Sequence, residues 1–214
     1  MALSLEDKGS QVGVYLANDT PQDWQGEVRW SLETLQGSRI DAGQEPVHVA
    51  PLASSMLRKF DFAAQLKRRG AKNLVFVAEL WQAGERLSCQ VAAFALEKDM
   101  HLPDPGLSYK IREISTGLII DISARALARF VSLSFSGADV IFSDNFFDLP
   151  AGRTQRVACQ LPDGWTLEQA RQNLIVRSLA DARPGGSALS DRIQRVLVGI
   201  NPVNLVSQIF VKFM

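Results

Sequence analysis

Short runs of apolar residues, most of them alternating with polar ones, follow one another along the chain and are separated by turn residues. In residues 27–35, one face takes Val28, Trp30 and Leu32, and the other face takes polar side chains. A strand with one buried face requires this period of two. The pattern therefore predicts two series of strands, at 12–17, 27–35, 47–49, 57–62, 74–81 and 87–96, and at 108–115, 118–123, 130–135, 140–142, 154–159 and 173–179.

Three segments interrupt the β pattern. Residues 101–106 hold two prolines and a glycine, and proline cannot donate to a β-ladder and restricts the residue before it. We interpret this segment as an interdomain linker. A basic stretch at 66–71 and an alanine-rich connector at 124–128 are each compatible with a single helical turn. No segment has the sustained 3.6-residue period of a crossover helix, so a doubly wound α/β fold is disfavoured.

The spacing of the strands predicts an all-β chain made of two tandem immunoglobulin-like β-sandwich domains. The first spans residues 1–100 and the second residues 101–183, and each holds about six short strands, close to the strand count of an immunoglobulin domain. Residues 184–214 form a C-terminal tail of a different character. Its apolar run at 205–213 suits an extra strand, a helix packed on the domain, or a non-native extension, and the sequence leaves these three open.

The charge balance narrows the classes of partner. The 214 residues carry 23 Lys and Arg against 23 Asp and Glu, so the formal net charge is zero. Nucleic-acid binding rests on neutralising phosphates and binding to a membrane surface rests on basic residues, so neither partner is expected. No apolar run is long enough to span a bilayer, and residues 1–8 lack the features of a signal peptide. A cytoplasmic location is favoured.

The two cysteines, Cys89 and Cys159, fall in different predicted domains. A disulfide between them would have to join the domains. We favour two buried free thiols, since an unpaired cysteine behaves as a small hydrophobic side chain.

Catalysis needs a constellation of side chains, and the sequence offers none. The two histidines, His48 and His101, have no second ligand at metal spacing and are interpreted as surface or linker residues. No glycine-rich loop opens a helix, and no Gly-x-Ser-x-Gly motif is present. Glu79 lies within an apolar run, which favours partial burial with a salt bridge, or a solvated sheet face, over an acid for glycoside hydrolysis. No catalytic residue, metal ligand or cofactor is therefore predicted.

The four tryptophans are the remaining candidates for ligand contact. Trp30 shares a face with apolar residues and is predicted to lie in the core, whereas Trp81 shares a face with both apolar residues and Glu79 and is ambiguous. Trp24 lies in a turn between strands, and Trp165 follows a Pro-Asp-Gly turn. We expect these two to be the more exposed ones, where their rings would contact a carbohydrate.

Two segments carry longer motifs. Residues 14–20 read VYLANDT, and the strand at 24–37 that follows reads WQGEVRWSLETLQG, with Asn18, Asp19 and Trp30 as its marked positions. These residues resemble the strand pair that opens the sandwich domain following the catalytic barrel in β-mannosidase-type glycoside hydrolases, in glycoside hydrolase family two.

The second motif, residues 140–152, reads VIFSDNFFDLPAG and is similar to a segment of the last sandwich domain of the same enzymes. A tyrosine is usual where Phe146 stands, and the proline and glycine are spaced differently here. We interpret the motif as a sandwich corner without a ligand, with domain docking as the alternative, because Ser, Asp and Asn side chains bond nearby backbone in turns. Its matching residues are Ser143, Asp144, Asn145, Phe147 and Asp148.

The resemblance covers about residues 10–180 and implies an accessory role. The catalytic site of the family lies in a (β/α)8 barrel with an Asn-Glu acid/base motif and a separate glutamate nucleophile. This chain has no Asn-Glu dipeptide and no room beside its strands for a barrel of about 250 residues. The resemblance therefore implies a non-catalytic C-terminal region, whose partner is the catalytic barrel of the parent enzyme.

Two other hypotheses stay open at this point. The first is a carbohydrate-binding module that uses Trp24 or Trp165 to bind a glycan. The second is an interaction or adhesion protein built from tandem sandwiches, which a contiguous exposed apolar patch would favour.

Overall fold

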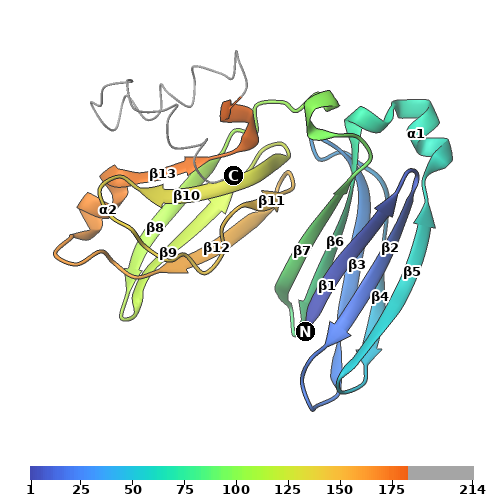
Figure 1. Ribbon diagram of the computed structural model, residues 1–214, viewed down its shortest axis with the longest axis horizontal. Coiled ribbons are helices and arrows are strands. Elements are labelled where there is room, and N and C mark those ends of the chain that lie inside the picture. The colour runs from blue at the N-terminus through green and yellow to red at the C-terminus, as the bar shows by residue number, and fades with distance from the viewer. Residues whose placement is uncertain (183–214) are drawn as a thin grey trace, which may run out of the picture.

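The computed structural model of the protein describes residues 1–182, and these form two β-sandwiches (Figure 1). The prediction of an all-β chain with two layered sandwiches is confirmed. Helices are limited to short segments between the strands. The predicted tail at 184–214 lies outside the described residues.

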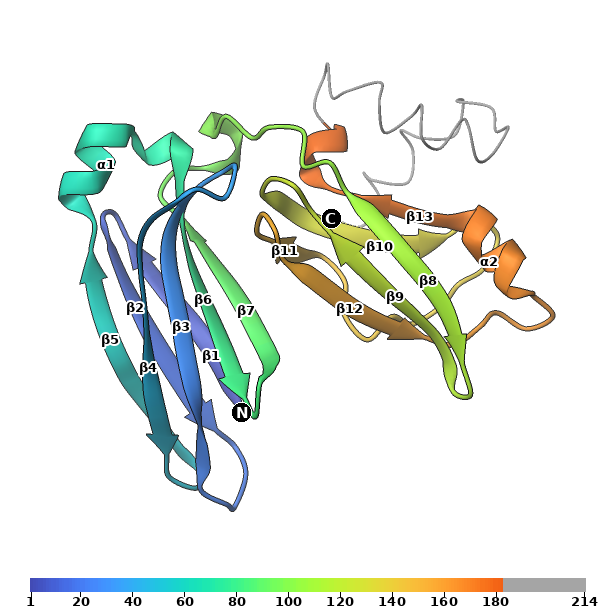
Figure 2. The same ribbon diagram turned by 180° about the vertical axis from the view of Figure 1, so that it is seen from behind.

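The first sandwich packs a three-stranded sheet on a four-stranded sheet, seen from both sides in Figures 1 and 2. The three-stranded sheet has the order β1 (Ala2–Lys8), β2 (Gln11–Asn18) and β5 (Ala53–Asp61). The four-stranded sheet has the order β4 (Arg39–Val49), β3 (Trp24–Thr34), β6 (Leu74–Gln82) and β7 (Glu85–Ala93). A short helix, α1 (Ala63–Arg69), and a 3-10 turn (Ala71–Asn73) connect β5 to β6.

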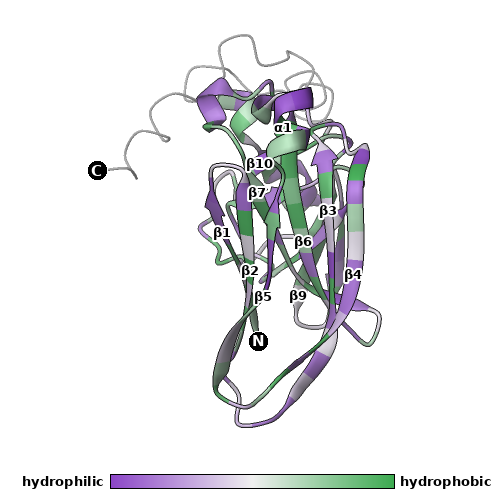
Figure 3. Ribbon diagram, turned by 90° about the vertical axis from the view of Figure 1, so that its right-hand side faces the viewer, coloured by the Kyte–Doolittle hydropathy of each residue, from purple (hydrophilic) through white to green (hydrophobic). Residues whose placement is uncertain are grey.

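Aromatic side chains fill the space between the two sheets of the first sandwich. The ring of Phe60 lies 4.6 Å from Trp30 and 5.0 Å from Phe76, measured between centroids. Phe76 is fully buried on β6, and Trp30 is half-buried against the same core, as predicted. The inner strand β6 is apolar over most of its length, whereas the edge strand β4 is largely hydrophilic (Figure 3).

The second sandwich packs two three-stranded sheets. One has the order β12 (Thr154–Cys159), β9 (Gly117–Ser123) and β8 (Ser108–Ile114), and the other has the order β11 (Phe147–Leu149), β10 (Ala128–Phe135) and β13 (Leu174–Arg177). A helix, α2 (Leu167–Asn173), precedes β13, and 3-10 turns lie at Glu97–Asp99 and Leu179–Ala182. The core contains Ile120, Ile122, Val131, Leu149 and Val157, all fully buried.

The structure corrects two local predictions and adds two elements. The connector at 124–128 forms no helical turn: it bends at 125–126 with its alanines and Leu127 buried, and β10 begins at Ala128. Residues 140–142 form no strand, apart from one bridge between Phe142 and Cys159. The sequence pattern also missed β1 and α2. In β1 only Leu3 is buried, and α2 is one short helix that begins at a capping box between Thr166 and Gln169.

Asn18, the first marked residue of the opening motif, joins the two sheets of the first sandwich. Its side chain is 1% exposed, and Nδ2 donates to the carbonyls of Gln22, Val49 and Ala50 at 2.7, 3.2 and 3.1 Å. Its Oδ1 accepts from the amide and hydroxyl of Thr20 at 3.2 and 2.8 Å. An amide side chain at the end of β2 therefore satisfies the carbonyl at the end of β4 and backbone groups of the adjoining loops.

We predict that Asn18→Ala lowers the free energy of unfolding by about 1–3 kcal/mol, because it leaves buried carbonyls without a donor. Urea denaturation measures this loss. The matched control is Asp19→Ala, at the exposed neighbouring position, which should stay within about 0.5 kcal/mol of the parent protein. Equal losses for the two variants would contradict a role specific to Asn18.

Candidate functional site at the domain interface

The two sandwiches meet where the outer face of β3, β6 and β7 lies against the second domain. Leu35, Val75 and Val77 of the first sandwich form a buried cluster with Met100, just before the linker, and Leu127 of the second sandwich. The amide of Leu127 donates to the carbonyl of Leu35 at 2.7 Å, so a backbone hydrogen bond also crosses the interface. Apolar burial thus covers one end of this sheet face.

A glycine allows the closest approach of the two domains. Gly37 has φ +87°, and a Cβ built on it would lie 2.6 Å from the Cβ of Ala151. Any other residue would collide with the second domain and would also strain the backbone. The glycine that ends the first motif is therefore a docking residue.

Arg153 makes the strongest polar contact across the interface. Its Nη1 and Nη2 donate to Glu33 Oε2 and Oε1 at 2.7 and 2.6 Å, a two-point contact of guanidinium and carboxylate. Ser31 Oγ donates to the same carboxylate at 2.6 Å. Glu33 is 1% exposed, so its charge depends on these partners. Burial acts to lower the pKa of Arg153, but the hydrogen bonds and charge of Glu33 outweigh it and the pKa is raised.

A second carboxylate and a second guanidinium complete the network. Glu79 Oε1 lies 3.1 Å from Arg86 Nη1 and 3.6 Å from Arg153 Nε. Two acidic and two basic side chains thus meet with a balanced charge, and all four are largely or fully buried. Both carboxylates are held by guanidinium groups, so neither is positioned as a free acid or nucleophile.

The burial of this network differs in part from what the alternation of apolar and polar residues predicted. Ser31 and Glu33 lie on the polar face of a strand that was predicted to have one buried face, yet both are buried because the second domain covers them. The prediction that Glu79 is partly buried with a salt bridge is confirmed. A period of two locates the two faces of a strand, but it does not identify what covers the outer one.

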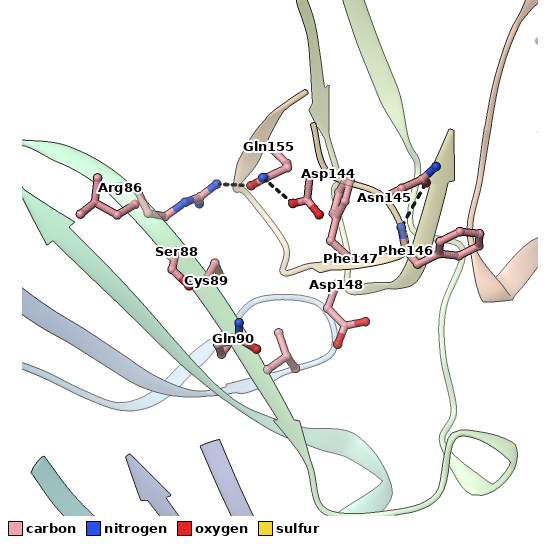
Figure 4. A pocket seen from close by; sticks show the side chains of 12 residues that line it. Arg86, Ser88, Cys89, Gln90, Asp144, Asn145, Phe146, Phe147, Asp148 and Gln155 are labelled. Atoms are coloured by element: carbon pink, nitrogen blue, oxygen red, sulfur yellow. Dashed lines mark hydrogen bonds between the residues drawn. The ribbon is translucent and has the colours of Figure 1, made fainter. Parts of the chain in front are cut away.

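Next to the network, a polar pocket of about 380 Å³ separates β7 from the corner formed by the second motif (Figure 4). Arg86 Nη2 donates to Gln155 Oε1 at 3.2 Å and to the carbonyl of Thr154. Gln155 Nε2 then donates to Asp144 Oδ2 at 3.0 Å. In Figure 4 Phe147 lies between Asp144 and Asp148, while the ring of Phe146 points away from β7. The pocket wall is thus a hydrogen-bonded extension of the interface.

The polar residues of the second motif bond the backbone of their own sandwich. Asn145 Oδ1 accepts from the amide of Leu133 at 2.8 Å, and its Nδ2 donates to the carbonyl of Leu133 at 3.0 Å. Ser143 Oγ accepts from the amide of Ala158 at 2.8 Å. These bonds replace ladder hydrogen bonds where the strands end, which supports the interpretation of a sandwich corner.

Asp148 connects this corner, through Arg129, to Glu97 at the end of the first domain. Arg129 is buried, with Nη2 at 2.7 Å from Glu97 Oε1 and Nη1 at 3.0 Å from Asp148 Oδ2. Asp148 Oδ1 also accepts from the amide of Phe130 at 3.1 Å. Burial raises the pKa of Asp148, and the charge of Arg129 opposes this rise.

The expected exposure of two tryptophans is not found. Trp24 is 8% exposed and belongs to the core of the first sandwich, because β3 already begins at this residue, so that prediction is wrong. Trp165 is half-buried against the core of the second sandwich, with its ring 5.7 Å from Phe135 in an edge-on contact. Trp24 is therefore buried, whereas Trp165 stays partly exposed. Trp81, the ambiguous one, lies half-buried on the outer side of its sheet beneath Arg29.

The remaining candidate residues carry no site. His48 and His101 are exposed, as predicted, and His48 Nε2 lies 3.0 Å from Asp23 Oδ1. Within residues 1–182, no group of three or more His, Cys, Asp and Glu side chains is placed to hold a metal. In the same range, no helix has the length and apolar character needed to cross a membrane. Both cysteines are free, and Cys159 is buried while Cys89 is half-buried at the interface.

Two family models match the two sandwiches. Residues 10–99 match the family described as Mannosidase Ig/CBM-like domain, and residues 102–182 match the family described as Ig-fold domain, named Ig_mannosidase. These matches confirm the immunoglobulin-like character of both sandwiches and the resemblance seen in the two motifs.

Solved structures share the fold of the pair. A β-D-mannosidase from Dictyoglomus thermophilum has a TM-score of 0.74 at 19% identity, over 83% of this chain and 21% of that one. An exo-chitosanase from Amycolatopsis orientalis has a TM-score of 0.61 at 12% identity, over 82% of this chain and 25% of that one. The chain thus spans about a fifth to a quarter of the length of these enzymes. No curated protein sequence matches it.

We predict that Arg153→Met destabilises the protein by about 3–5 kcal/mol, because it leaves Glu33 as an unpaired buried charge. Denaturant unfolding measures the loss. Arg39→Met is the matched control: Arg39 lies 3.7 Å from the same carboxylate but its side chain is 66% exposed, so its removal should cost less than about 1 kcal/mol. Adding Glu33→Gln to Arg153→Met should recover part of the loss, and no recovery would show that the buried charge is not its cause.

The thiols predict a dependence of stability on alkaline pH. Burial, with a contribution from Glu79, raises the pKa of Cys89 from 9.0 to about 12, and burial raises that of Cys159 to about 11. The unfolded chain therefore loses thiol protons from pH 9 upward while the folded chain keeps them, so stability falls over this window. Unfolding curves at pH 8 and above 9 measure the fall, which Cys89→Ala should reduce. An unchanged fall in that variant would contradict the assignment.

Proposed function

We propose that this chain, whose two halves belong to the immunoglobulin-like domain families of mannosidase-type enzymes, has no catalytic role of its own. It is an accessory region of a β-mannosidase-like glycoside hydrolase. Its role is to pack on the catalytic barrel of the parent enzyme and to support it. The main support for this proposal is the buried network of Arg153, Glu33, Glu79 and Arg86 between the two domains.

A rigid support needs its two parts fixed relative to each other. Arg153 and Glu33 lie in different sandwiches and form a buried two-point contact. A second ion pair joins the domains, since Glu97 at the end of the first domain binds Arg129 of the second sandwich. Burying these charges between the domains makes any other relative orientation unfavourable, because each alternative leaves a charge without a partner. A pair of sandwiches fixed in this way suits a supporting surface.

The absence of a free carboxylate pair in residues 1–182 is consistent with the non-catalytic role. Glu33 and Glu79, the buried glutamates of this part of the chain, are both neutralised by guanidinium groups. Glycoside hydrolysis requires two carboxyl groups that reach the same sugar. The free thiols also favour a reducing compartment, in keeping with the cytoplasmic location expected from the sequence.

The two alternative functions have less support. A carbohydrate-binding module acting through Trp24 or Trp165 has less support, since Trp24 is buried in a core and Trp165 is half-buried against one. A tandem-sandwich adhesion protein would need a contiguous apolar patch. The exposed large apolar residues of the described part are spread over separate strands and loops of the two sandwiches, for example Leu52, Leu87 and Ile141.

We predict that the full chain alone does not hydrolyse p-nitrophenyl β-mannoside, and that it raises the melting temperature of the barrel encoded upstream of its reading frame when the two are mixed. A continuous barrel-coding region upstream is the first observation to make. Turnover by the isolated chain would refute the proposal. So would a barrel whose melting temperature is the same with and without the chain and which does not co-elute with the chain in gel filtration. Addition of an unrelated immunoglobulin-like domain controls for non-specific stabilisation.

A further inference from the structure

A solvent-open groove with a volume of about 920 Å³ lies beside the interdomain network and is lined by both sandwiches. Its floor is the outer face of the four-stranded sheet, and its second wall is the segment around β12. The floor includes Trp81 and Arg29, the rim of the first sandwich includes Arg39, and the second sandwich supplies Arg156. The groove exists only in the docked arrangement of the two domains.

Three arginines of the groove have unused hydrogen-bond donors. Arg29 engages Glu27 through Nε, Arg156 engages Asp121 through Nε at 2.8 Å, and Arg39 approaches Glu33 through Nε at 3.7 Å. In the described part of the chain the Nη groups of all three have no hydrogen-bond partner. A guanidinium presents these donors as a rigid fork that matches a carboxylate.

The side chains that line the groove include more cationic than anionic groups. The lining contains the five arginines 29, 39, 86, 153 and 156 against the two carboxylates of Glu79 and Asp121, although the whole chain has a net charge of zero. Two of these arginines, Arg86 and Arg153, already bind the carboxylates of the buried network. The three with free Nη groups are the exposed ones, with Arg39 and Arg156 each 66% exposed.

The floor of the groove contains an aromatic side chain, Trp81, with an unpaired hydrogen-bond donor. The guanidinium of Arg29 lies 4.2 Å from the centroid of the Trp81 ring. Trp81 Nε1 is buried and has no hydrogen-bond partner among the described residues. A buried donor without an acceptor is rare and marks a position where a water or a ligand hydroxyl completes the site.

We propose that this groove binds a saccharide that carries carboxylate groups. The carboxylates engage the Nη groups of Arg39, Arg156 and Arg29 from the two walls. Drawing Arg29 toward a carboxylate uncovers the ring of Trp81 as an apolar floor, and a sugar hydroxyl supplies the acceptor for Nε1. An acidic peptide would satisfy the arginines, but it lacks the hydroxyl-rich ring that matches the indole. The site does not depend on the proposed support of a barrel.

The test titrates the full chain with the trimers of galacturonate and mannuronate, following tryptophan fluorescence and heat. The matched neutral probes are the methyl esters of the same trimers, and triglutamate tests the acidic-peptide alternative. We expect at least one uronate trimer to bind, its ester and triglutamate to bind about tenfold more weakly, and about 0.5 M NaCl to weaken the binding because the arginines are exposed.

Variants assign the binding to the groove. Arg39→Gln and Arg156→Gln should each weaken it about tenfold, and Trp81→Phe should weaken it and remove the fluorescence change. Arg68→Gln, an exposed arginine on α1, is the matched control and should bind as the parent does. Melting temperatures establish that each variant is folded. No binding of either uronate, equal binding of the esters or of triglutamate, or an equal effect of Arg68→Gln would overturn the proposal.

Discussion

The contact between Arg153 and Glu33 is the constraint on which the arrangement of the whole molecule depends. Burying a carboxylate and a guanidinium costs several kcal/mol of desolvation, and only a close two-point geometry with further hydrogen bonds offsets that cost. Ser31 and Glu79 supply those further contacts here. The contact therefore contributes orientation more than stability, because the charges are satisfied only when the second sandwich occupies its observed position.

Several features that look independent follow from this one orientation. Gly37 is required because the docked loop brings Ala151 to within contact of its Cα. The polar pocket beside β7 exists because Arg86 reaches across to Gln155. The larger groove gains its second wall from the same docking. The two sandwiches thus acquire surface features as a pair that neither sheet arrangement would have alone.

The sequence predicted what is local and failed where the deciding partner is distant. A period of two located most strands, since each strand's inward face is set by its own residues. The burial of Glu33 on the polar face of its strand could not be predicted, because its partner lies 120 residues further along the chain. Trp24 was assigned to a turn because the start of β3 is not visible in the alternation, and its burial depends on the opposite sheet. The motif residues were found by resemblance, yet their roles became clear only from contacts: Asn18 and Asn145 satisfy backbone groups at sheet edges.

The outer face of β3, β6 and β7 illustrates how one sheet surface takes two roles. In an isolated sandwich this face would be solvated, and its polar residues would need no explanation. Docking covers the end that contains Ser31 and Glu33 and leaves the end that contains Arg29 and Trp81 open beneath the second domain. Residues two positions apart on the same strand therefore serve different purposes, one set fixing the domains and the other facing a groove. The charge pattern follows this division, since Glu33 at the covered end is neutralised by Arg153, while Arg29 at the open end lies over Trp81 and bonds Glu27 only through Nε.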